Sequence, residues 1–146
     1  MSADADRALM RRAIALARTG LGMTGANPSV GCVIARDGRV IAEAVTAGGG
    51  RPHAEEQALD VAGDGARGAV AFISLEPCGE RSSGAPSCAS RLIAAGIARV
   101  AYACGNPDRR SAGSGPGALE AARVSVERGL LADEAADLYA TLRSPS

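Results

Sequence analysis

The chain has 146 residues, and its 16 basic and 16 acidic side chains give a formal net charge of zero. This length suits one compact domain over residues 1–146, and the hydrophobic content of 47% is higher than that of a disordered chain. The lack of a basic surplus and the scarcity of aromatic residues argue against nucleic-acid binding, and no apolar run approaches the roughly 20 residues of a membrane span.

Hydrophobic periodicity and turn residues predict helices and strands that alternate along the chain. Helices are predicted over residues 4–18, 52–62, 87–95, 119–122 and 133–142. Strands are predicted over residues 30–35, 40–45, 69–75, 97–104 and 124–126. The Asp37-Gly38 turn joins the first two strands as a hairpin. This order predicts an α/β fold in which helices cover both faces of one sheet.

The composition also constrains how this fold is packed. Of the 146 residues, 32 are Ala, so the core is expected to contain small aliphatic side chains with backbones in close approach. The glycine-rich stretch 113–117 lacks the lysine and the glycine spacing of a phosphate loop, and it is predicted to be a flexible loop over the active site.

The first six residues carry acidic rather than basic side chains, which argues against a signal peptide and predicts a cytoplasmic protein. The four cysteines are then expected to be thiols, metal ligands or core residues rather than disulfides. Cys32 and Cys104 lie in apolar predicted strands, which favours a place in the core. Cys78 follows a predicted strand, and Cys88 lies in the first turn of the next predicted helix.

The single histidine, His53, lies at the start of a predicted helix. One imidazole and the thiolates of Cys78 and Cys88 would supply three of the four ligands of a tetrahedral zinc ion. The fourth position would hold water, as in a catalytic site. Helix N-termini also favour thiolates over thiols, because backbone N–H groups stabilise the anion.

Glu55 adds a candidate proton carrier. On a regular helix its side chain would point about 200° away from that of His53, but both can line one pocket if a metal caps the helix end. A carboxylate that is not a ligand can move a proton from water to a departing nitrogen. His-x-Glu followed by Pro-Cys is typical of zinc deaminases. The alternative interpretation makes Cys78 and Cys88 ordinary buried thiols and Glu55 a solvated helix residue.

Five stretches carry a resemblance to a known family: Asn27-Pro28-Ser29-Val30-Gly31-Cys32-Val33-Ile34, Gly50-Arg51-Pro52-His53-Ala54-Glu55, Ser74-Leu75-Glu76-Pro77-Cys78, Pro86-Ser87-Cys88 and Ala95-Gly96-Ile97-Ala98-Arg99-Val100. Through them the chain, from about residue 8 to residue 142, resembles the deaminase domain of the bifunctional riboflavin biosynthesis deaminase/reductase family. The nine residues between the two cysteines favour this branch over tRNA or cytidine deaminases.

The resemblance implies a cytidine-deaminase-like three-layer α/β/α sandwich around a mostly parallel, mixed sheet of five strands. It implies zinc on His53, Cys78 and Cys88, with Glu55 as the proton shuttle and Asn27 in contact with the substrate. In the implied reaction, water on the zinc attacks the ring carbon of a diaminopyrimidinone ribosyl-phosphate, and the exocyclic amine leaves as ammonia.

The chain departs from the family pattern around the expected substrate. Thr46 stands where the family usually has a histidine, seven residues before His53. In a stretch with one extra residue, Glu80 stands where another histidine is expected, and Arg81 could partly restore its positive charge. Asn106-Pro107-Asp108-Arg109 replaces an Asp-Pro-Asn-Pro motif. Thr46, Glu80, Arg81 and Asn106 are therefore candidate substrate contacts, and an acidic residue beside a phosphate would repel it.

Three hypotheses follow. The leading one is zinc-dependent deamination of the riboflavin precursor. The second is deamination of a different base, nucleoside or pterin, which the altered substrate contacts favour. The third is a non-catalytic, zinc-stabilised subunit that binds a separate reductase, since no reductase domain follows in this sequence and no nicotinamide site is expected. A homodimer is also expected.

Overall fold

The structure is a computed structural model, and it describes residues 3–25, 28–79, 87–105 and 113–140. Five strands form one sheet in the order β2-β1-β3-β4-β5. Their bounds are β1 (Gly31–Arg36), β2 (Arg39–Val45), β3 (Val70–Leu75), β4 (Arg99–Cys104) and β5 (Ser125–Arg128). β1 runs antiparallel to both of its neighbours, whereas β3, β4 and β5 pair in parallel. Four of these five strands therefore point in one direction, and the predicted mixed sheet is confirmed.

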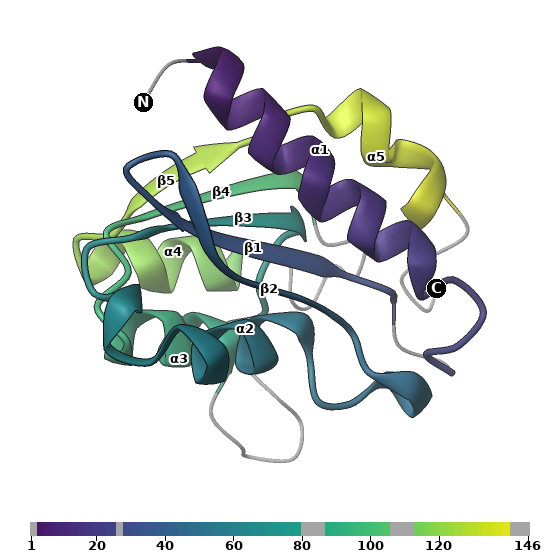
Figure 1. Cartoon of the computed structure of the whole chain (residues 1–146), viewed down its shortest axis with the longest axis horizontal. Coiled ribbons are helices and arrows are strands. Elements are labelled where there is room, and N and C mark those ends of the chain that lie inside the picture. The colour runs from purple at the N-terminus through teal and green to yellow at the C-terminus, as the bar shows by residue number, and fades with distance from the viewer. Residues whose placement is uncertain (1–2, 26–27, 80–86, 106–112, 141–146) are drawn as a thin grey trace.

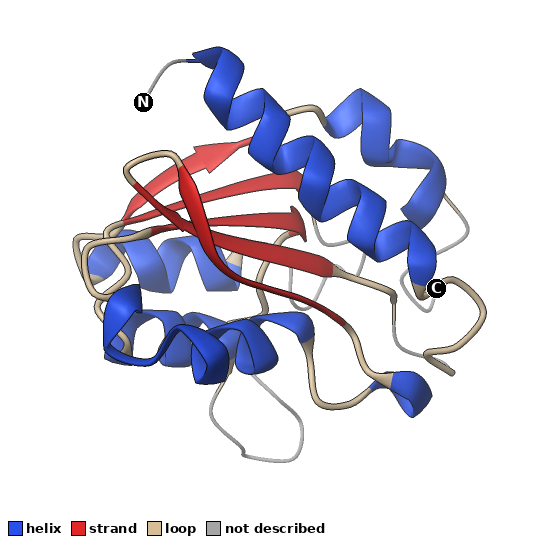
Figure 2. Ribbon diagram, in the orientation of Figure 1, coloured by secondary structure: helices blue, strands red, loops and turns tan. Residues whose placement is uncertain are grey.

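Helices cover both faces of the sheet (Figures 1 and 2). On one face lie α1 (Ala3–Thr19) and α5 (Ala132–Tyr139), and on the other lie α2 (Ala54–Ala62), α3 (Cys88–Ala94) and α4 (Ser114–Ala121). Two short 3-10 helices, η1 (Gly48–Gly50) and η2 (Gly63–Ala66), flank α2 in the chain. The three-layer α/β/α architecture and the predicted order of helices and strands are both confirmed.

The start of α4 is the main correction to the predicted elements. The stretch 113–117 was expected to be a flexible loop, but α4 begins at Ser114, and Gly115 and Pro116 are buried in its first turn. A proline is tolerated in a first turn because its missing N–H would have no partner within the helix. A smaller correction concerns α2, which begins at Ala54, so that His53 is the residue preceding the helix.

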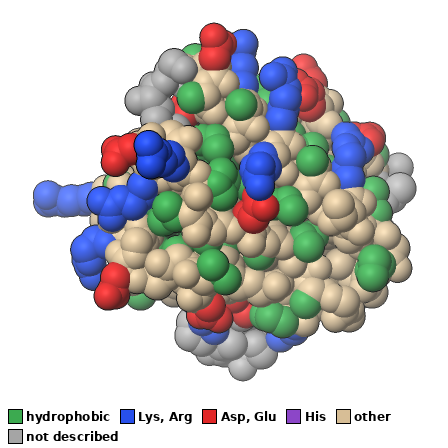
Figure 3. Space-filling model, viewed as in Figure 1, with side chains coloured by type: hydrophobic (Ala, Val, Ile, Leu, Met, Phe, Trp, Pro, Cys, Tyr) green, Lys and Arg blue, Asp and Glu red, His purple; other side chains and the backbone are tan. Residues whose placement is uncertain are grey.

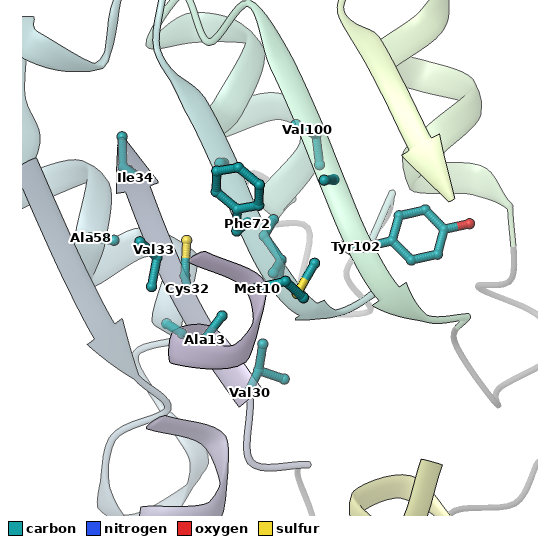
Figure 4. Close-up of a cluster of buried hydrophobic side chains, with 14 of the residues drawn as sticks. Met10, Ala13, Val30, Cys32, Val33, Ile34, Ala58, Phe72, Val100 and Tyr102 are labelled. Carbon is teal, nitrogen blue, oxygen red and sulfur yellow. The ribbon is translucent and has the colours of Figure 1, made fainter. Parts of the chain in front are cut away.

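The core consists largely of small aliphatic side chains, as the composition predicts. Phe72 of β3 is fully buried and lies on the α1 face of the sheet, with Val33 of β1 beside it in register and Met10 of α1 nearby (Figure 4). Helix α1 lies so close to β1 that a Cβ added at Gly31 would stand 1.9 Å from the Ala13 carbonyl oxygen. The predicted close approach of backbones is therefore present at this crossing.

The surface carries both signs of charge. Acidic and basic side chains are interspersed over the face seen in Figure 3. Several pair between elements; for example, Arg11 and Arg18 of α1 form salt bridges with Glu134 and Asp137 of α5. Across the described ranges, no helix combines the length and the apolar character needed to cross a bilayer.

Candidate metal centre

The sheet topology brings the predicted site segments together at one edge of the sheet, namely the edge at which β2, β3 and β4 end and β1 begins. Because β1 opposes the other strands, its beginning lies beside the ends of β2, β3 and β4. Thr46 follows β2, and Cys78 follows β3 after a short turn. Ligands of such sheets bind at the carboxyl ends of the parallel strands, which is this edge. The predicted substrate residues Asn27, Glu80, Arg81 and Asn106 lie outside the described residues.

The structure brings the three predicted metal ligands together. His53 directly precedes α2, Cys88 is the first residue of α3, and Cys78 lies in the turn after β3. One donor atom from each residue lies within 4.8 Å of the other two. The His53 Nδ1 atom is 3.4 Å from the Cys88 Sγ, and the Cys88 backbone N–H donates to the Cys78 Sγ at 3.3 Å. Two helix N-termini therefore converge on the turn after β3.

The pKa values of the two cysteines are shifted in a way that suits the binding of a divalent cation. The Cys88 thiol, with smaller help from the His53 ring and the Cys88 backbone N–H, lowers the pKa of Cys78 to about 4. The proximity of Cys78, together with burial, raises the pKa of Cys88. The thiolate form is thus favoured at Cys78 and disfavoured at Cys88. A metal ion would supply the positive charge that allows both to bind as thiolates, and the set of one nitrogen and two sulfurs suits zinc.

Glu55 lies beside these donors in the first turn of α2, and only 4% of it is exposed. Burial raises the pKa of its carboxyl group, and the group interacts with both Cys78 and Cys88. The backbone of His53 is extended (φ −69°, ψ 159°), so the angular spacing of a regular helix does not separate its side chain from that of Glu55. The geometry thus places a buried carboxyl next to the candidate metal.

A second set of contacts, which sequence reasoning did not find, supports the turn that carries Cys78. The Glu76 carboxylate accepts a hydrogen bond from the Gly113 N–H at 2.8 Å, just before α4. A Cβ added at Gly115 would stand 1.9 Å from the Pro77 carbonyl oxygen, and one at Gly79 would stand 2.5 Å from the backbone of Ser114. The backbone of the turn after β3 therefore contacts the backbone of the first helical turn of α4, and only glycines permit so close an approach.

Thr46 is buried at the end of β2. Its hydroxyl oxygen accepts a hydrogen bond from the Val30 N–H at 2.9 Å, and its own N–H donates to the Val30 carbonyl at 2.9 Å. The side chain thus bonds to the backbone of the segment that precedes β1. A contact between Thr46 and substrate stays a prediction.

An imidazole and two thiols at two helix N-termini, with a buried glutamate beside them, form the type of site that zinc-dependent deaminases use. A family model described as the cytidine and deoxycytidylate deaminase zinc-binding region matches residues 3–104 of the chain. The chain belongs to this deaminase family.

Its relatives specify the branch. The riboflavin biosynthesis protein RibD of Escherichia coli (strain K12) is 43% identical over 133 residues, which are 91% of this chain and 36% of that protein. The diaminohydroxyphosphoribosylamino-pyrimidine deaminase of Buchnera aphidicola subsp. Schizaphis graminum is 37% identical over 129 residues, 88% of this chain and 87% of that protein. Among solved structures, Acinetobacter baumannii RibD superposes with a TM-score of 0.90 at 41% identity, covering 95% of this chain and 39% of that one.

These matches confirm the resemblance to the deaminase domain of the riboflavin deaminase/reductase family. The chain spans only about a third of the length of the first curated relatives that it matches, 36% in the Escherichia coli protein. The Buchnera relative, in contrast, is matched over most of its length and is named as a deaminase alone.

Proposed function

We propose that the chain is a zinc-dependent deaminase that hydrolyses the exocyclic amine from a diaminopyrimidinone ribosyl-phosphate in riboflavin biosynthesis. The observation that carries this proposal is the cluster of His53, Cys78 and Cys88 with the buried Glu55 beside it. The substrate class is supported by the names of the relatives, above all by that of the Buchnera deaminase.

His53, Cys78 and Cys88 would hold the zinc ion, because their donor atoms lie close enough to share one ion and belong to three separate segments. When bound, zinc makes water a nucleophile at neutral pH. The positive N-terminal ends of α2 and α3 stabilise the two thiolates. Three protein ligands leave room for a non-protein ligand, which is a feature of catalytic rather than structural zinc sites.

Glu55 would carry the proton. Burial raises the pKa of its carboxyl group above the ordinary value, which favours the uptake of a proton during the reaction. Its Oε atoms would take the proton from the attacking water and deliver it to the exocyclic nitrogen of the substrate, which leaves as ammonia. The burial that raises this pKa also excludes bulk water from the transfer.

Ammonia release from candidate substrates tests the proposal. Zinc-loaded protein is expected to deaminate the phosphorylated diaminopyrimidinone, and Glu55→Gln, which has the same shape, should keep zinc while kcat falls about 10²–10⁴-fold. Asp60→Asn makes the same chemical change at an exposed position of α2 and should leave kcat unchanged. Full activity of Glu55→Gln would show that the proposed proton transfer is wrong.

The second candidate is deamination of an unphosphorylated base, nucleoside or pterin. It is favoured by the hydrogen bonds of Thr46, whose hydroxyl is bonded to the protein backbone at a position where the family usually has a histidine. Assaying each substrate with and without its phosphate separates the two candidates. A preference for the phosphorylated form eliminates the second one.

The proposal includes a cytoplasmic location, a homodimer and a separate reductase as partner. A reductase as partner is supported by the name of a solved Thermotoga maritima relative, which is called both a deaminase and a reductase. Analytical ultracentrifugation of the chain tests the dimer, and a sedimentation coefficient of a monomer at micromolar concentration would reject it.

A further inference from the structure

A buried chain of hydrogen bonds ties α5 to the beginning of β1. The Tyr139 hydroxyl donates to the Ser29 carbonyl at 2.8 Å and lies 2.7 Å from the Ser74 hydroxyl. Because a phenol has one proton, Ser74 must donate to Tyr139, and the Ser74 oxygen in turn accepts from the Gly31 N–H at 2.9 Å. Burial, with small contributions from Cys104 and Glu55, raises the pKa of Tyr139, so the phenol stays a neutral donor.

The segment of residues 29–31 is fixed by hydrogen bonds and by a close backbone contact, which come from several parts of the fold. Thr46 bonds to both the N–H and the carbonyl of Val30. The Ser29 hydroxyl donates to the Ala17 carbonyl at 2.6 Å, at the end of α1. The Gly31 backbone touches α1, as described above. Tyr139 and Ser74 contribute the remaining bonds, and Ser74, Thr46 and Ser29 are all buried. The two residues before β1 and the first residue of β1 are thus fixed by side chains from α5, from β3 and from the residue that follows β2.

The position of this segment connects it to the site. It lies at the sheet edge that carries the candidate metal centre, and its anchor Ser74 is four residues before Cys78 in the chain. None of the three candidate metal ligands belongs to the segment. Loosening the segment should therefore change how substrate is seated at this edge without changing how the metal is held.

We infer that Tyr139 is a positioning residue for substrate binding, acting through Ser74 and the segment 29–31. This inference rests on the proposed function. Removal of the phenol oxygen leaves the Ser29 carbonyl and the Ser74 hydroxyl without their partner, and the segment then samples other positions.

The test compares Tyr139→Phe with Ser74→Ala, which interrupts the same chain, and with Leu138→Ala. Leu138 is the buried neighbour of Tyr139 on α5, so its truncation weakens the packing of the helix but leaves the hydrogen bonds in place. Tyr139→Phe is expected to raise KM for the phosphorylated diaminopyrimidinone about 3–10-fold, with kcat within about 2-fold and zinc content unchanged. Leu138→Ala should lower the melting temperature and leave KM as in the wild type.

Two further measurements make the inference specific. The double variant Tyr139→Phe/Ser74→Ala should show no larger rise in KM than Ser74→Ala, because both changes break one chain. Hydrogen exchange of peptides that contain residues 28–31 should be faster in Tyr139→Phe than in the wild type and in Leu138→Ala.

An unchanged KM, or a loss of zinc or kcat at constant KM, overturns the inference. An equal rise in KM in Leu138→Ala also overturns it, because the effect would then come from helix packing. If the wild type deaminates no candidate substrate, the proposed function fails. In that case hydrogen exchange tests the anchoring role of Tyr139 separately. Unchanged exchange over residues 28–31 in Tyr139→Phe rejects this role, and faster exchange supports it.

Discussion

Replacing Gly115 by alanine should weaken zinc binding, although Gly115 is not one of the candidate ligands. The added Cβ would stand 1.9 Å from the Pro77 carbonyl oxygen and 3.3 Å from the backbone carbon of Cys78. Non-bonded contacts of a Cβ below 3.0 Å essentially never occur, so α4 and the turn after β3 must separate by about 1.1 Å. Both contact atoms are backbone, and no side-chain rotation can relieve the overlap.

The expected cost has two components. Overpacking of this kind destabilises a protein by about 1–3 kcal/mol, which lowers the melting temperature of a domain of this size by roughly 3–10 °C. The displaced turn carries Cys78, and loss of outer support for a metal ligand typically costs about 10–100-fold in affinity, or about 1.4–2.7 kcal/mol. We therefore expect the zinc dissociation constant of Gly115→Ala to rise by this factor.

The assay is competition for zinc against a chromophoric chelator, together with thermal unfolding of the metal-free protein. Gly117→Ala is the matched control, since it makes the same change two residues further along α4 at a position with no atom within 4 Å of the added Cβ. It should leave zinc affinity unchanged and, by helix propensity, raise stability by about 0.5–1 kcal/mol. Equal zinc affinities and melting temperatures of the two variants would refute the close contact.

Three further predictions concern stability and reactivity. Gly31→Ala should destabilise the fold by about 1–3 kcal/mol in urea unfolding, because its Cβ meets the Ala13 carbonyl, and a change below about 0.5 kcal/mol would contradict this packing. Phe72→Ala should cost about 3–5 kcal/mol by the same measurement, since the fully buried ring would leave a cavity. In metal-free protein the pKa of Cys78 is lowered to about 4, so the thiolate exists above that pH, and iodoacetamide should label Cys78 at an equal rate at pH 6 and pH 8. Burial raises the pKa of Cys32, so this control thiol should stay unlabelled. Added zinc should protect Cys78 from labelling. A labelling rate of Cys78 that rises tenfold per pH unit would reject the lowered pKa.

The elements that the sequence predicted well are those with local signals. Apolar runs bounded by glycine, proline and Asp37-Gly38 placed the strands, and the order of elements followed from them. The three candidate metal ligands could be singled out because His53 and Cys88 occupy helix starts and Cys78 follows a strand. Each position is marked by its own neighbours in the chain.

The parts that were missed depend on distant partners. The glycines and proline at the start of α4 suggest a loop when taken locally, but contact with Pro77, about forty residues earlier, fixes them in a helix. Ser74 and Tyr139 are separated by 65 residues, and no periodicity links them. The one available signal was a serine inside an apolar strand, because a buried hydroxyl needs a partner. Asn27, Glu80, Arg81 and Asn106 rest on the family resemblance and lie outside the described residues.

The burial of Tyr139 has a practical consequence for solution work. The chain contains no tryptophan and only two tyrosines, so its ultraviolet fluorescence comes from Tyr102 and Tyr139. Zinc itself has no optical signal, yet a phenol that is hydrogen-bonded at the beginning of β1 changes its emission when those bonds change. A Tyr102→Phe variant would leave a single built-in fluorophore at this position, and ligand titrations could then be followed without any label.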